Sequence, residues 1–140
     1  MKLLSFDIEI SDVFELGPYE DMETYAPFHI SVAATAIHGG EERVWYSEDQ
    51  EGRPALNLTP RRAHELLVYL DEMQQKEFMV CAWNGLSFDL KWIGHQAGDM
   101  GLAALVIFAD AGVDVGVLEV GMGGRLDAVN AVEPTAGLIT

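Results

Sequence analysis

The sequence predicts an α/β fold built on a mixed sheet in three layers. Three observations support this class: an apolar, alternating segment at the start of the chain, two further strand-like segments joined by a glycine turn, and helical patterns that alternate with strand-like segments from residue 59 onward. The chain has 140 residues, of which 49% are hydrophobic, and this suits one packed domain spanning residues 1–140.

The first elements are expected to be strands. Lys2–Ile10 alternates between apolar and polar side chains, as a half-buried strand does. His29–His38 and Arg43–Ser47 flank the turn at 39–40, so they are expected to form an antiparallel hairpin. Ser11–Phe28 is predicted to be an acidic loop, and its length indicates a functional role because structureless loops this long are uncommon.

Helical signals begin at Thr59 and Pro60, which suit the N-cap and first turn of a helix. Apolar residues then recur at helical spacing at Ala63, Leu66, Leu67, Leu70 and Met73. A short strand is expected over Phe78–Trp83, followed by helices over Phe88–Gln96 and Gly101–Ala111.

The end of the chain is expected to extend the sheet as a Rossmann-like strand-helix-strand tail. Val113–Val120 is strongly apolar and predicts a buried strand, Gly121–Asn130 a glycine-rich loop, and Thr135–Thr140 a last short strand. A helix followed by a buried strand can extend a parallel sheet.

Charge and composition exclude several classes of function. The 23 acids and 8 bases give a net charge of −15. This argues against a protein that binds nucleic acid or an anionic membrane through an overall positive charge. A single cysteine, Cys81, excludes an internal disulfide and a cysteine-rich zinc site. No apolar run is long enough to span a membrane, so a cytoplasmic protein without a membrane partner is expected.

Asp7 and Glu9 are the strongest candidates for chemistry. Side chains alternate along a strand, so both carboxylates are expected on one face of the first strand, where they repel each other. A divalent cation would remove that repulsion, and oxygen ligands suit Mg²⁺ or Mn²⁺ better than zinc. The alternative is an edge strand on which both acids are simply solvated.

A second candidate is Asp89, which follows the short strand and stands at the start of a helix. A carboxylate just beyond the end of a strand is well placed to face a site. The alternative is a capping residue that complements the helix dipole.

Taken together, Leu4–Glu9 and Trp83–Leu90 resemble the first two motifs of the DEDD-type 3′–5′ exonucleases of the ribonuclease H-like superfamily. The likeness is greatest to exonucleases related to the proofreading domain of family B DNA polymerases. It covers residues 1–100, an exonuclease-like segment, and implies a ribonuclease H-like fold.

The resemblance also implies a two-metal mechanism with Mg²⁺ or Mn²⁺ on the 3′ end of a single-stranded nucleic acid. Asp7 would contact both metals, Glu9 would hold one and orient the water, and Asp89 would bind the second. Asn84 and Phe88 would shape the pocket for the terminal nucleotide. Neither the choice between DNA and RNA nor the oligomeric state follows from the sequence.

The third motif of that family, with a fourth carboxylate and a general base, has no convincing equivalent. The residue types of His95–Asp99 match that motif. However, this segment is expected to continue the helix that Asp89 opens, which would place Asp99 about 15 Å further along the helix axis. The predicted site is therefore incomplete, and an inactive domain is the alternative.

The tail, from Leu102 to Thr140, resembles folylpolyglutamate synthase/dihydrofolate synthase, a Mur-ligase relative, and defines a ligase-like segment over 101–140. The resemblance rests mainly on residues 113–128, and its motif residues are Glu119, Gly123, Gly124, Arg125 and Asp127. In that family the glutamate serves a Mg²⁺ site; the alternative is a structural carboxylate bonded to loop amides. No phosphate-binding P-loop motif occurs in the chain, so no ATP is expected.

The two resemblances meet near residue 100, where the composition also changes: of thirteen aromatic residues, only Phe108 follows that point. A chimera is the economical explanation. Three functions stay open: a metal-dependent 3′–5′ exonuclease-like domain, a non-catalytic chimeric α/β domain, and a ligase fragment without its P-loop.

Overall fold

The computed structural model describes residues 2–82 and 88–110. Its elements are β1 (Lys2–Ile10), the 3₁₀ helix η1 (Met22–Tyr25), β2 (Ile30–Ile37), β3 (Glu42–Trp45), α1 (Pro60–Gln75), β4 (Phe78–Cys81), α2 (Leu90–Ala97) and α3 (Met100–Asp110). The tail strands and the loop expected after residue 112 lie outside the described residues.

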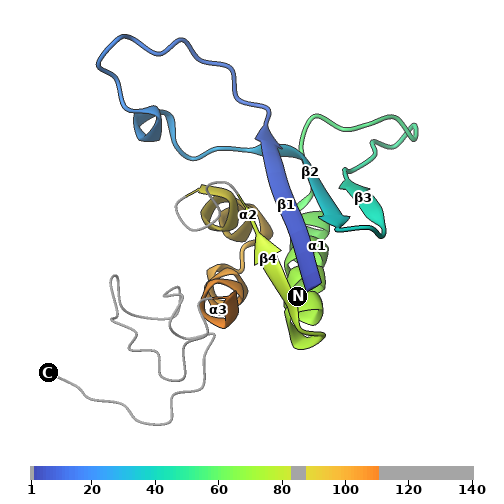
Figure 1. Ribbon diagram of the computed structural model, residues 1–140. Helices are drawn as coiled ribbons and strands as arrows, with labels where there is room; N and C mark the ends of the chain where they lie inside the picture. The colour runs from blue at the N-terminus through green and yellow to red at the C-terminus, as the bar shows by residue number, and fades with distance from the viewer. Residues whose placement is uncertain (1, 83–87, 111–140) are drawn as a thin grey trace, which may run out of the picture.

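Four strands form a mixed sheet in the order β3-β2-β1-β4 (Figure 1). β2 pairs antiparallel with both β1 and β3, so the predicted hairpin is confirmed. β4 joins the other side of β1 in parallel, after the chain has crossed over through α1. The mixed α/β class is therefore correct.

The core lies between the sheet and the helices. Along β1 the side chains of Leu4, Phe6 and Ile8 are buried, while the alternate positions face solvent. On α1 the residues predicted to face the core are the buried ones: Ala63, Leu66, Leu67, Leu70 and Met73. Thr59 caps this helix as predicted, because its side chain accepts a hydrogen bond from the Arg62 amide at 3.2 Å.

The described residues form two layers, where the sequence predicted three. α1 contacts α2 and α3, which also contact each other, so the helices make a single layer on one face of the sheet (Figure 1). On the opposite face of β1, the residues Ser5, Asp7 and Glu9 are exposed. The alternation along β1 fits this arrangement, because strands that are covered on both faces are apolar at consecutive positions.

The junction of α2 and α3 corrects the prediction that His95–Asp99 continues one helix. α2 ends at Ala97, and Gly98 takes the left-handed conformation (φ 69°) that glycine adopts without steric cost. Asp99 then lies in the turn and its Oδ1 accepts a hydrogen bond from the Leu102 amide at 2.9 Å, which caps α3.

Within the described residues, no helix has both the length and the apolar character needed to cross a membrane.

Candidate functional site

Asp7 and Glu9 share one face of β1, as predicted, and both side chains are exposed. Their partners across the antiparallel pair are Ala34 and Val32, neither of which carries a charge. β1 is not an edge strand, since it lies between β2 and β4. However, β4 pairs with β1 only as far as Ser5, so both carboxylates lie beyond the point where that pairing ends.

This position is the one that sheet topology favours for a site. β1 and β4 are parallel, and both point toward the end of the sheet where the two acids lie. Ligands of open α/β sheets commonly bind beyond the carboxyl ends of parallel strands. The two carboxylates are thus accessible and lie on the same face of one strand, with Cα atoms about 7 Å apart.

Asp89 differs from this pair because it is buried, with 4% of its surface exposed. It directly precedes α2 and has helical backbone dihedrals itself (φ −60°, ψ −53°), and its side chain does not cap this helix. The contrast of one buried and two exposed acids does not follow from their spacing in the sequence.

Among residues 2–82 and 88–110, no group of three or more His, Cys, Asp or Glu side chains is arranged to hold a metal ion. The three predicted ligands Asp7, Glu9 and Asp89 all belong to these ranges. Asp7 and Glu9 therefore share one face of β1, but the structure does not group Asp89 with them as a metal site. The shared metal site stays a prediction.

Phe88, predicted to line a nucleotide pocket, belongs to an aromatic cluster. Its ring centroid lies 5.5 Å from that of Phe28 and 6.4 Å from that of Trp92. Trp92 is buried and meets Phe28 edge-on, with ring centroids 4.9 Å apart, so it packs in the core. Asn84, the other predicted pocket residue, lies outside the described residues.

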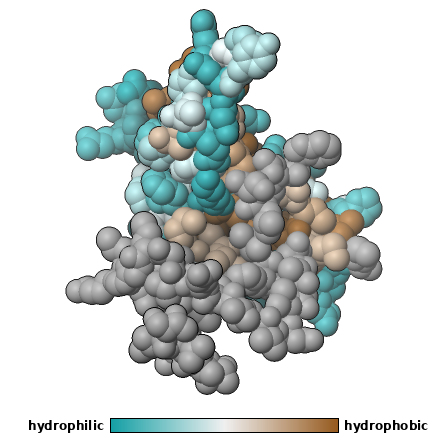
Figure 2. Space-filling view, turned by 90° about the vertical axis from the view of Figure 1, so that its left-hand side faces the viewer, coloured by the Kyte–Doolittle hydropathy of each residue, from teal (hydrophilic) through white to brown (hydrophobic). Residues whose placement is uncertain are grey.

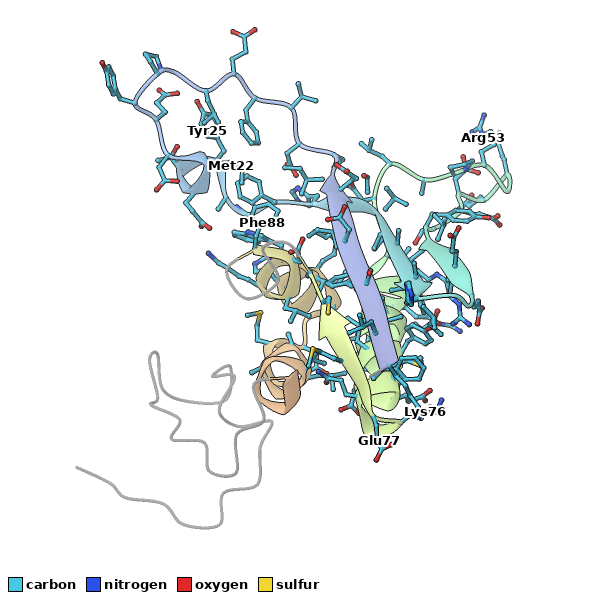
Figure 3. The ribbon with its side chains drawn as sticks, in the orientation of Figure 1. Met22, Tyr25, Arg53, Lys76, Glu77 and Phe88 are labelled. Atoms are coloured by element: carbon cyan, nitrogen blue, oxygen red, sulfur yellow. The ribbon has the colours of Figure 1, made fainter. Side chains whose placement is uncertain are left out.

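The loop over residues 11–28, which we call the acidic loop, is attached to the end of the sheet next to this cluster. Met22 and Tyr25 of η1 lie on the side of the loop that faces Phe88 (Figure 3). Lys91 of α2 extends toward the loop, and its Nζ contacts both carboxylate oxygens of Glu23 at 2.9 and 3.0 Å. These contacts fix the loop against α2.

A second anchor holds the base of the acidic loop. Asp12 Oδ2 accepts a hydrogen bond from the His29 amide at 2.6 Å, and Asp12 Oδ1 lies 3.0 Å from His29 Nδ1. Partial burial raises the pKa of Asp12, but the amide, the ring and the charge of His29 outweigh that effect and hold the pKa below its ordinary value.

The sequence interpretation missed these anchors. The partners Lys91 and Glu23 are 68 positions apart, and no local pattern connects them. The aromatic residues Phe14, Tyr25 and Phe28, spaced along an otherwise acidic segment, were the available signal that this loop packs on something.

The ligase-like residues Glu119, Gly123, Gly124, Arg125 and Asp127 lie outside the described residues.

Comparison with known proteins found short matches to one kind of enzyme. The chain is 65% identical over 37 residues to a probable bifunctional folylpolyglutamate synthase/dihydropteroate synthase of Haloferax volcanii. It is 57% identical over 37 residues to the dihydrofolate synthase/folylpolyglutamate synthase of Mycobacterium tuberculosis, and 51% identical over 39 residues to that of Escherichia coli.

These matches cover 26–28% of the chain and only 4–9% of the length of the relatives. No family model matches the chain, and no solved structure matches it. The matches support the folylpolyglutamate synthase part of the predicted resemblance, whereas they give no support to its exonuclease part.

Proposed function

We propose that this chain joins a mixed α/β domain to a segment of folylpolyglutamate synthase origin and that it does not itself ligate glutamate. The observation that carries this proposal is the 51–65% identity to such enzymes over 37–39 residues. Identity at this level over so short a stretch favours common origin of the segment, while 4–9% of an enzyme is too little to supply its whole active site.

The chemistry of the segment leads to the same conclusion. An ATP-dependent ligase needs backbone amides and a lysine to hold the nucleotide phosphates, and a P-loop is the usual source of both. The 140 residues contain no such motif. The described domain has a net excess of acids rather than the cationic side chains that would replace it.

The test is ligase activity of the full 140-residue chain. We would incubate it with Mg²⁺, ATP, glutamate and a reduced folate, and follow both ADP release and the glutamylated product, with a full-length folylpolyglutamate synthase as the positive control. The expected result is no product above the rate without protein, and no heat of Mg²⁺–ATP binding by calorimetry. Folate-dependent ADP release with glutamylated product would reject the proposal.

A second candidate is a metal-dependent 3′–5′ exonuclease-like activity. It is favoured by one specific observation: Asp7 and Glu9 are exposed on one face, beyond the end of the β1–β4 pairing. Their oxygens suit Mg²⁺ or Mn²⁺, which when bound would activate water and stabilise the leaving oxygen. Asp89, Asn84 and Phe88 would complete the site as the sequence resemblance implies.

This candidate is tested with a 5′-labelled single strand of DNA or RNA and Mn²⁺. Asp7→Asn removes a predicted ligand, and Glu42→Gln on β3 is the matched control, because Glu42 lies on the same sheet face two strands away. We expect slow, Mn²⁺-dependent shortening that Asp7→Asn abolishes and Glu42→Gln preserves. Shortening that persists in Asp7→Asn would identify a contaminating nuclease, and no shortening together with no Mn²⁺ binding would exclude the activity.

A further inference from the structure

The acidic loop extends away from the rest of the described molecule and exposes apolar side chains. Figure 1 shows it as the blue segment that extends beyond the sheet, and Figure 2 shows hydrophobic and hydrophilic side chains next to each other on it. Val13 is 98% exposed, Tyr19 is 100% exposed and Leu16 is 49% exposed. Three large exposed apolar side chains within seven residues of a projecting segment favour an interaction surface.

The loop is held in one shape by its own side chains. The rings of Phe14 and Tyr25 stack with centroids 4.7 Å apart, which closes the two arms of the loop on each other. At the tip, Glu20 Oε2 accepts hydrogen bonds from the Gly17 amide and from the Tyr25 hydroxyl, both at 2.9 Å. The exposed residues Val13, Leu16 and Tyr19 are therefore displayed on a framework that is already ordered.

Its attachment to the body is also fixed, by the Asp12–His29 and Glu23–Lys91 contacts described above. An ordered loop loses little conformational freedom when a partner binds, so more of the contact energy appears as affinity. Tyrosine is the kind of side chain that contributes strongly at such surfaces, since it buries a large ring and keeps a polar tip.

Charge identifies the class of partner. Residues 11–28 contain five acids and no lysine or arginine. Glu15 is exposed and has no ion-pair partner among the described residues, so its carboxylate is available to a cation from outside. A nucleic acid backbone and an anionic membrane would both be repelled, as would a second copy of a chain that carries a net charge of −15.

We propose that the acidic loop docks a basic polypeptide segment, in which lysine or arginine alternates with aliphatic or aromatic side chains. The apolar side chains of the partner would cover Tyr19, Val13 and Leu16, and its cations would face the Glu15 carboxylate. This inference is independent of the proposed function, because it uses none of the residues of the ligase-like segment or of the Asp7–Glu9 pair.

The experiment measures fluorescence anisotropy of a labelled synthetic peptide in which lysine alternates with leucine, titrated with the full chain. A second peptide carries serine in place of each leucine and has the same charge. We expect the first peptide to bind about tenfold more tightly than the second. The double variant Val13→Ser/Tyr19→Ser should weaken binding of the first peptide by about tenfold.

The matched control is Leu56→Ser, because Leu56 is 73% exposed but lies in a different loop, and this variant should bind the first peptide as the parent does. All variants change exposed side chains, so circular dichroism should show the parent's fold and melting temperature. Equal binding of the two peptides, or equal loss in Leu56→Ser, would overturn the proposal in favour of bulk charge. A dimer of the chain that Val13→Ser/Tyr19→Ser abolishes would overturn it in favour of a second copy.

Discussion

The side-chain amide of Gln96 makes paired hydrogen bonds to the backbone of Ile30. The Ile30 amide donates to Gln96 Oε1 at 2.6 Å, and Gln96 Nε2 donates to the Ile30 carbonyl at 3.0 Å. Nε2 also donates to the carbonyl of Leu58 at 2.7 Å, and the Leu58 amide donates to the Ile30 carbonyl at 2.8 Å. One side chain of α2 thereby connects the start of β2 to the segment that leads into α1.

Replacing this amide should destabilise the whole domain. Gln96→Ala leaves the Ile30 amide and the Leu58 carbonyl without these partners, and Ile30 is completely buried. We expect the free energy of unfolding in urea to fall by about 2–3 kcal/mol. Gln75→Ala is the control, since the Gln75 side chain is exposed and bonds to Asp71 within α1; it should change stability by about 0.5 kcal/mol or less. Equal effects of the two variants would contradict the role of Gln96.

The close approach of α2 and α3 depends on Gly94. A Cβ at this position would lie 2.7 Å from the Ala103 Cβ and 3.1 Å from the Met100 sulfur. Because overpacking forces the helices apart, Gly94→Ala should lower the free energy of unfolding by about 1–2 kcal/mol, despite alanine's better helix propensity. A double-mutant cycle with Ala103→Gly isolates the contact, and the double variant should be more stable than the sum of the single effects predicts. Strict additivity would show that the two sites do not meet.

The Lys91–Glu23 contact should control the motion of the acidic loop more than global stability. Both side chains are partly exposed, so Lys91→Met should change the free energy of unfolding by less than about 1 kcal/mol. However, amide hydrogen exchange measured over residues 11–28 should speed up, because one of the two anchors is lost. Lys76→Met is the control, since Lys76 contacts Glu72 within one helix turn. Unchanged exchange in the Lys91 variant would mean that the Asp12–His29 anchor and the aromatic contacts hold the loop without Lys91.

Local signals predicted the elements of this fold, and long-range contacts decided the candidate site. Thr59, Pro60 and the apolar spacing that follows them specify α1, because capping and helical period act within a few residues. By contrast, the burial of Asp89 and the exposure of Asp7 depend on which elements pack above each residue, and the residues next to them in the sequence do not predict either. The same is true of Gln96, whose partners are 38 and 66 positions away.

The anchor at Asp12 should make the acidic loop sensitive to acid. The contacts with His29 lower the folded-state pKa of Asp12 below its value in the unfolded chain, even though burial acts in the other direction. A carboxyl group with a lowered pKa contributes stability that is present above its unfolded pKa and is lost as the pH falls through its folded pKa. Hydrogen exchange over residues 11–28 should therefore accelerate, relative to its intrinsic rate, as the pH falls through that acidic range.

Asp12→Asn provides the test, because the neutral amide retains an oxygen acceptor but does not titrate. The variant should show faster exchange near neutral pH and should lose the part of the acid-dependent acceleration that belongs to this anchor. Asp71→Asn is the control: Asp71 bonds to Gln75 on α1, outside the loop, so this variant should keep the parent's pH profile over the loop. A carboxyl carbon titration by NMR measures the pKa of Asp12 directly. A value at or above that of an unfolded aspartate would remove the physical basis for the predicted acid sensitivity.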